Sequence, residues 1–161
     1  MRAPLLLVAP VLAAFAFSGC ATTIDDKKGE EALQKSQEQL GIKVKSVDCP
    51  SGKTAKKGDV FTCTVTAQDG SSGDITVTET DAKGNVTYNQ PFIKPKTLAD
   101  AVAAKFSQES GVDGITADCP DIVELKQGAQ TECEASKNRD KVTLVVKFSA
   151  NGIASVRPKG Q

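Results

Sequence analysis

The hydrophobic pattern divides the chain into an apolar N-terminal run and a longer part with alternating helical and strand periodicity. The run extends from about Pro4 to Phe17, follows one basic residue, Arg2, and is followed by a polar stretch. It is shorter than the roughly 20 apolar residues that cross a bilayer. This layout predicts a secretory signal peptide over residues 1–19.

Helical periodicity occurs twice. In the second instance Leu98, Val102 and Phe106 recur at helical spacing after a capping-box-like start at Thr97, and Gly111 is placed to end the helix. The first predicted helix starts near Asp26 and ends at Gly41. Its apolar stripe is thinner and comprises Ala32, Leu33 and Leu40.

Strand patterns follow each predicted helix. In residues 61–67 apolar side chains alternate with threonines, which is the period of a half-buried antiparallel strand. Further strands are predicted before the first cysteine of each half, over Ile75–Thr80 and over Val142–Phe148. Short fourth strands are expected after the turns at residues 81–84 and 149–152.

The chain matches itself when it is shifted by 70 residues. Gly41–Cys63 then aligns with Gly111–Cys133 without a gap. The identical pairs are Gly41/Gly111, Asp48/Asp118, Cys49/Cys119, Pro50/Pro120, Lys56/Lys126, Gly58/Gly128 and Cys63/Cys133. We interpret this as a tandem duplication.

The predicted fold class is therefore α+β, with two tandem repeats that each pack one helix on a small antiparallel sheet of about four strands. The first repeat is placed at residues 29–90 and the second at 97–158. Residues 91–96 contain two prolines and are expected to be a flexible linker, so each repeat is expected to fold alone.

Four of the five cysteines lie within the repeats and allow three pairings. A unit that folded before it was copied must have satisfied its own cysteines, so we predict the disulfides Cys49–Cys63 and Cys119–Cys133. Each closes a loop of about 15 residues, which contributes roughly 3 kcal/mol in the chain-entropy model. The wide spacing and the lack of histidine argue against a zinc site.

The fifth cysteine, Cys20, follows Phe17-Ser18-Gly19 at the end of the apolar run. This segment resembles the lipobox of bacterial lipoproteins, which implies diacylation of the cysteine sulfur and cleavage before it. Residues 20–28 would then be a tether at the extracytoplasmic face of the bacterial cell membrane. The alternative is cleavage after Ala21, which would release a freely secreted protein.

The charge and composition of the chain argue against several classes of function. From Cys20 onward there are 19 Lys and Arg, the 20 of the whole chain less Arg2, against 20 Asp and Glu. This balance argues against a nucleic-acid partner, which requires a basic surface. The chain has no histidine, which excludes a Ser-His-Asp triad. We expect no metal and no cofactor.

Two motifs carry a family resemblance. Gly-Ile-x-Val-x-Ser-Val-Asp-Cys-Pro at residues 41–50 and Lys-Lys-Gly-Asp-x-Phe-x-Cys at residues 56–63 resemble the domain of unknown function 4333 (DUF4333) family of exported actinobacterial proteins and lipoproteins. Both repeats fit the pattern. The resemblance implies an envelope location and an α+β domain with paired cysteines, and it carries no activity or site residues.

The leading functional hypothesis is a non-enzymatic interaction module of the cell envelope that binds a protein or a wall component. The loops between the paired cysteines differ most between the repeats. The candidate binding residues are Lys53, Lys56, Lys57, Ile122 and Val123. Leu125, opposite Ala55, is expected to pack inward. The alternatives are an inhibitor of a secreted enzyme and an enzyme with a Ser-Lys or carboxylate site.

Overall fold

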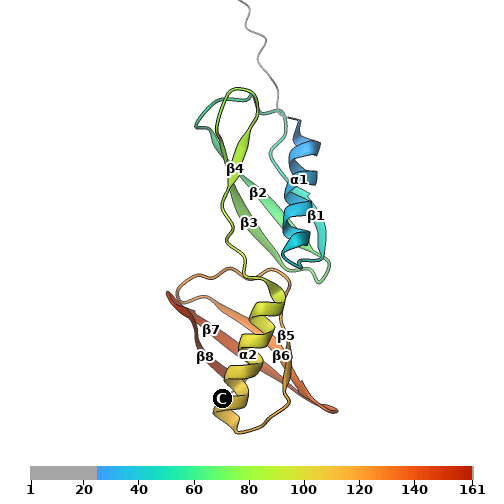
Figure 1. Ribbon diagram of the computed structural model, residues 1–161, viewed down its shortest axis with the longest axis vertical. Helices are drawn as coiled ribbons and strands as arrows, with labels where there is room; N and C mark the ends of the chain where they lie inside the picture. Colours follow the sequence, from blue (N-terminus) through green and yellow to red (C-terminus); the bar gives the residue numbers. More distant parts are fainter. Residues whose placement is uncertain (1–24, 161) are drawn as a thin grey trace, which may run out of the picture.

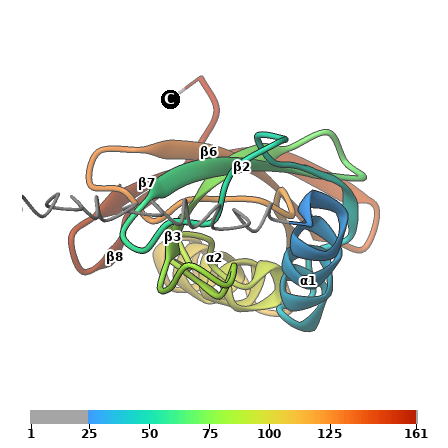
Figure 2. The same cartoon turned by 90° about the horizontal axis from the view of Figure 1, so that it is seen from above.

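The computed structural model describes residues 25–160, which form two α+β repeats placed end to end along the long axis of the molecule (Figure 1). The predicted signal peptide, Cys20 and most of the predicted tether lie outside the described residues. Figure 2 shows that both helices lie on the same side of the two sheets.

Helix α1 spans Asp26–Gln39 and follows the N-cap Asp25, whose carboxylate accepts a hydrogen bond from the Lys28 backbone N–H at 3.3 Å. The predicted tether is therefore too long, because its last residues already belong to the helix and its cap. Leu40 is the C-cap of the helix, and Gly41 then adopts a φ of 90°, a conformation that glycine accepts without a steric penalty.

Helix α2 spans Pro95–Ser110 and ends at Gly111, which is left-handed with a φ of 70° as predicted. Its start differs from the prediction. The N-cap is Lys94, which makes no side-chain cap hydrogen bond, so the capping box at Thr97 is wrong. Proline fixes a φ that suits the first turn and lacks the N–H that would be unpaired there, so Pro95 starts the helix earlier.

Each repeat contains one antiparallel four-stranded sheet in which consecutive strands are neighbours. The first sheet comprises β1 (Val44–Asp48), β2 (Val60–Ala67), β3 (Ser72–Glu79) and β4 (Val86–Tyr88). The second comprises β5 (Thr116–Asp118), β6 (Gln130–Lys137), β7 (Asp140–Ser149) and β8 (Gly152–Pro158). The predicted fold class is confirmed.

The disulfides join Cys49 to Cys63 and Cys119 to Cys133, as the duplication predicts. Cys63 and Cys133 are buried on the face of the sheet that carries each core. Each bond thus fastens the loop after the first strand of a repeat to the second strand beneath its helix.

Each repeat has its own hydrophobic core, but the core of the first repeat includes two residues from beyond its predicted boundary. Phe92 and Ile122 are each 6% exposed and pack with Leu33, Val65 and other residues of repeat one. Residues 91–96 are therefore not a free linker. Phe92 forms an isolated β-bridge with Glu124, and α2 begins within the same segment.

The contact between the repeats is close-packed. Gly73 of β3 has no side chain, and a Cβ there would lie 2.6 Å from the Phe92 ring and 3.0 Å from Ile122. The backbone N–H groups of Asp121 and Ile122 donate to Asp69 at 2.9 Å and to the Ser71 hydroxyl at 3.0 Å. The repeats consequently share one packed interface rather than a flexible connection.

Candidate ligand-binding groove

The lysines predicted to bind a partner lie on the loop between the first two paired cysteines. Lys53 is half-buried, and its ammonium lies 5.9 Å from the centre of the Phe61 ring. Lys56 is exposed and lies 3.7 Å from the Asp59 carboxylate, and Lys57 is exposed. These side chains remain on the surface and do not converge on a cavity.

The apolar candidates Ile122 and Val123 are buried, and this corrects their prediction as residues exposed to a partner. Ile122 lies in the first core, whereas Val123 lies in the second, and the Val123 carbonyl accepts a hydrogen bond from Ile93 N–H at 3.1 Å. Their loop thus joins the two repeats.

Leu125 is 49% exposed, although its counterpart Ala55 is buried. The prediction that Leu125 packs inward is therefore wrong. The preceding Ile122 and Val123 already occupy the interior, and Leu125 is left at the surface.

The two helices differ at one inward-facing position. Leu33 of α1 and Val102 of α2 each lie eight residues after the N-cap of their helix, which is Asp25 in α1 and Lys94 in α2. Gln37 and Phe106 each lie twelve residues after the same N-caps. Four residues after the same caps, α1 has Gly29 where α2 has Leu98. Leu98 is completely buried, whereas a Cβ on Gly29 would meet nothing within 4 Å. Repeat one therefore lacks a core side chain that repeat two has.

The sheets differ at a second core position. The Glu79 carbonyl accepts from Gly58 N–H at 2.8 Å, and the Phe148 carbonyl accepts from Gly128 N–H at 2.9 Å, so Glu79 and Phe148 are equivalent. Glu79 is 1% exposed. One carboxylate oxygen accepts from Lys56 N–H, and the other, Oε1, has no hydrogen-bond partner among the described residues. A carboxylate thus replaces a phenylalanine ring.

The first of these replacements, Gly29, lines a groove of about 500 Å³ between the first half of α1 and the β3–β4 edge of the sheet. Its apolar walls include Leu33, Phe61, Val77, Val86 and the Tyr88 ring. The other lining residues are Asp25, Asp26, Lys28, Gly29, Ala32, Cys49, Lys83, Gly84 and Asn85. Gly29 leaves space in this groove, because a Cβ at this position would meet nothing within 4 Å.

The Tyr88 hydroxyl shares a hydrogen bond with Ser36 at 2.5 Å. Further along α1, the side-chain amides of Gln37 and Gln90 bond each other reciprocally at 3.1 Å. These contacts hold α1 against β4 and the segment that follows β4.

Acidic groups at the groove are already engaged. Hydrogen bonds from the Lys28 side chain and backbone hold the pKa of Asp25 below its usual value, and the two side chains form an ion pair at 3.0 Å. Asp26 accepts a hydrogen bond from Gly52 N–H at 3.0 Å. Lys83, by contrast, makes no ion pair within residues 25–160. Asp26 and Lys83 are thus the two charged lining residues without an ion-pair partner among the described residues.

Asn85, the neighbouring rim residue, is fixed by Asp81. Its side-chain amide donates to Asp81 at 2.6 Å, and this bond, with the backbone N–H of Lys83, lowers the pKa of the Asp81 carboxyl. The turn that carries Lys83 is thus held by a carboxylate that lies outside the groove lining.

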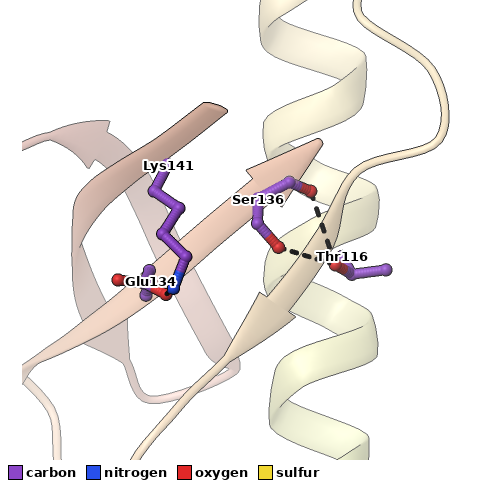
Figure 3. Close-up of polar contacts among 4 residues, drawn as sticks. All are labelled: Thr116, Glu134, Ser136 and Lys141. Atoms are coloured by element: carbon purple, nitrogen blue, oxygen red, sulfur yellow. Dashed lines mark hydrogen bonds and ion pairs between the residues drawn. The ribbon is translucent and has the colours of Figure 1, made fainter. Parts of the chain in front are cut away.

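Repeat two has a smaller cavity, of about 220 Å³, near the end of α2. Ser136 and Lys141 are among its lining residues. Figure 3 shows that Thr116 and Ser136 share a hydrogen bond, of 3.0 Å, and that Lys141 reaches Glu134 at 2.6 Å. The bond to Glu134 raises the pKa of the Lys141 ammonium, so this lysine is already paired.

Within residues 25–160, no three His, Cys, Asp or Glu side chains cluster in a way that would hold a metal ion. Over the same residues, no helix is long and apolar enough to cross a membrane.

Comparison with known proteins gives a family for the first repeat. Residues 10–84 match the model of a family described as a domain of unknown function, DUF4333. No curated protein and no solved structure matches the chain. The matched range covers α1 and the first three strands, and the second repeat lies outside it. The first repeat is therefore a DUF4333 domain.

Proposed function

We propose that this protein is a lipid-anchored, extracytoplasmic binding protein that holds a ligand of the cell envelope in the groove of its first repeat. The groove carries the proposal, because it is large, mostly apolar and specific to one of two otherwise equivalent repeats. The second repeat, a DUF4333-like copy in this proposal, acts as a packed support.

The anchor rests on the sequence. Cys20 follows a signal-peptide-like run and is the one cysteine without a partner in the two disulfides. Four residues lie between it and Asp25, which lines the groove, and the five Cα–Cα steps from Cys20 to Asp25 span at most about 18 Å when fully extended. A diacylated Cys20 at the membrane would keep the groove near the lipid headgroups.

A non-enzymatic role agrees with how the polar groups of the groove are used. Asp25 caps α1, the Asp26 carboxylate accepts a hydrogen bond from the Gly52 backbone, and the Asn85 side chain donates one to Asp81. These contacts stabilise the walls and leave no nucleophile and base side by side in the lining. Binding is therefore the function that this arrangement supports best.

The anchor is tested by mass spectrometry of the mature protein extracted from membranes of its native host. We expect an N-terminal Cys20 that carries added acyl mass. The Cys20→Ala variant should leave the mature membrane-bound form and accumulate as precursor or in the medium. A mature N-terminus at Thr22 without acyl mass would contradict the anchor.

The groove is tested with the amphiphilic dye 1-anilinonaphthalene-8-sulfonate, whose fluorescence rises in apolar surroundings. We expect one saturable site per chain in the folded protein. Gly29→Leu should abolish this site by filling the groove, whereas Glu31→Leu, which adds a leucine to an exposed position of α1, should retain it. Equal binding by both variants would refute the groove as the binding site.

A further inference from the structure

The groove requires an occupant that is mainly apolar. Its volume of about 500 Å³ lies within the range of small-molecule pockets, which are lined chiefly by hydrophobic and aromatic side chains. Leu33 and Val77 are buried at its walls, and Phe61 is half-buried. An aliphatic chain would cover these surfaces and remove them from water, which is favourable at about 25 cal/mol per Å² of apolar area.

The rim supplies one ammonium group that can contact the occupant. Lys28 is neutralised by Asp25, and the Asp26 carboxylate accepts a hydrogen bond from the Gly52 backbone. The exposed Lys83 lies in the turn of Asp81 and forms no ion pair among the described residues, so its ammonium is free to contact an occupant. An ammonium beside an apolar groove suits an amphiphile with an anionic head, because the head can form a charge-assisted hydrogen bond while the tail is buried.

The location of the groove selects the source of this amphiphile. If Cys20 is anchored as proposed, only a short tether separates the groove from the membrane surface. Phospholipids are the abundant anionic amphiphiles of that surface. Repeat two has Leu98 at the position of Gly29, and Leu98 is buried in its core. Only repeat one therefore has room for a lipid tail at this position.

We propose that the groove of repeat one takes one acyl chain of an anionic membrane phospholipid, with the lipid phosphate at Lys83. This inference rests on the proposed function and names its ligand. The apolar walls bind the chain, and Lys83 contributes selectivity for an anionic head.

The experiment uses the full-length protein in membranes of its native host. Cells are fed a fatty acid that carries a photoreactive diazirine, which they incorporate into phospholipids. After irradiation, adducts are mapped by mass spectrometry. We expect glycerophosphate-containing adducts on peptides covering residues 26–33 and 83–88, which contribute to the groove lining.

Matched variants connect the adducts to the groove. Gly29→Leu should abolish them and Glu31→Leu should retain them. Lys83→Gln should reduce their yield about five-fold, in line with the loss of one exposed charge-assisted contact, while Lys57→Gln should not change it. Melting curves confirm that each variant is folded. Adducts that persist in folded Gly29→Leu would overturn the proposal.

The composition of the adduct separates the possible sources. A link between a groove peptide and the peptide that contains residue 20 would show that the protein's own anchor fills the groove. An adduct without glycerophosphate would show a free fatty acid, and no adduct at the groove would show that no acyl chain binds there. Each of these results would overturn the proposal.

Membrane fractionation of the same samples tests the lipid anchor separately from the ligand. A chain in the soluble fraction with phospholipid adducts at the groove would refute the anchor and support the ligand. A membrane-bound, acylated chain without such adducts would refute the ligand and leave the anchor intact.

Discussion

Gly29 and Leu98 occupy the same position of two equivalent helices, four residues after the N-caps Asp25 and Lys94. The leucine is completely buried in the core of repeat two, and the glycine faces open space in repeat one. Glycine within a helix costs roughly 0.5–1 kcal/mol relative to alanine. Repeat one is therefore less stable at the position where its groove opens.

We expect Gly29→Leu to stabilise the protein and Leu98→Ala to destabilise it. The first change adds helix propensity and buries apolar surface, and should raise the free energy of unfolding by about 1 kcal/mol. The second leaves a cavity and should lower it by about 2–5 kcal/mol. Urea denaturation checks both predictions: the midpoint concentration of urea should shift, while the slope of the unfolding free energy against urea concentration stays constant. A destabilising Gly29→Leu would mean that the groove does not accept a side chain.

Loss of either disulfide should lower the free energy of unfolding by about 2–5 kcal/mol. The paired changes Cys49→Ala with Cys63→Ala and Cys119→Ala with Cys133→Ala are compared by thermal denaturation. When its own bond is removed, repeat one should unfold at a lower temperature than repeat two, because repeat one has Gly29 where the core of repeat two has Leu98. Non-reducing peptide mapping of the native protein should recover no Cys49–Cys119 peptide.

The shared interface should couple the unfolding of the two repeats. Ile122→Ala removes a side chain that repeat two places in the core of repeat one, and should cost about 2–5 kcal/mol. Leu125→Ala, at an exposed position of the same loop, should change stability by less than about 0.5 kcal/mol.

Hydrogen exchange measures this coupling. In Ile122→Ala, amide protection should fall in β3 of repeat one as well as in the loop of repeat two. Loss of protection confined to repeat two would contradict the shared core. Gly73→Ala provides an independent check, since its added methyl would press on the Phe92 ring and should also destabilise the interface.

Acid should weaken the interface through Asp69. Partial burial acts to raise the pKa of this carboxyl, but hydrogen bonds from the Ser71 hydroxyl and the Asp121 and Ser71 backbone outweigh it, so the pKa lies below the usual value of 3.8. The folded protein therefore gains stability from ionised Asp69 above pH 3.8. This gain is lost as the pH falls through the lower, folded-state pKa.

Asp69→Asn should accordingly lower stability at pH 7 and flatten the acid limb of the stability curve. Urea denaturation from pH 7 to pH 2 measures both effects. Asp74→Asn, which removes an exposed carboxylate of β3, is the comparison variant. An acid limb that is unchanged in Asp69→Asn would show that this carboxylate does not contribute to the interface.

Local patterns in the sequence determined much of this fold. The alternation in β2, the glycines that end both helices and the cysteine spacing depend on residues close together in the chain. The repeat then selected the disulfide pairing, because each copy had to satisfy its own cysteines. Local patterns do not predict the start of α2, because Pro95 lies in a proline-containing segment whose composition is typical of a linker.

Only the tertiary structure decided which sequence differences between the repeats form an interface and which open a groove. Ile122 and Phe92 are apolar residues in loop-like segments, and their burial depends on Gly73, which is distant in sequence and leaves room for both. The groove likewise depends on comparing Gly29 with Leu98 across two packed cores. Periodicity identifies the face of a helix that turns inward, but whether that face meets a side chain or open space depends on the volumes of residues from several strands.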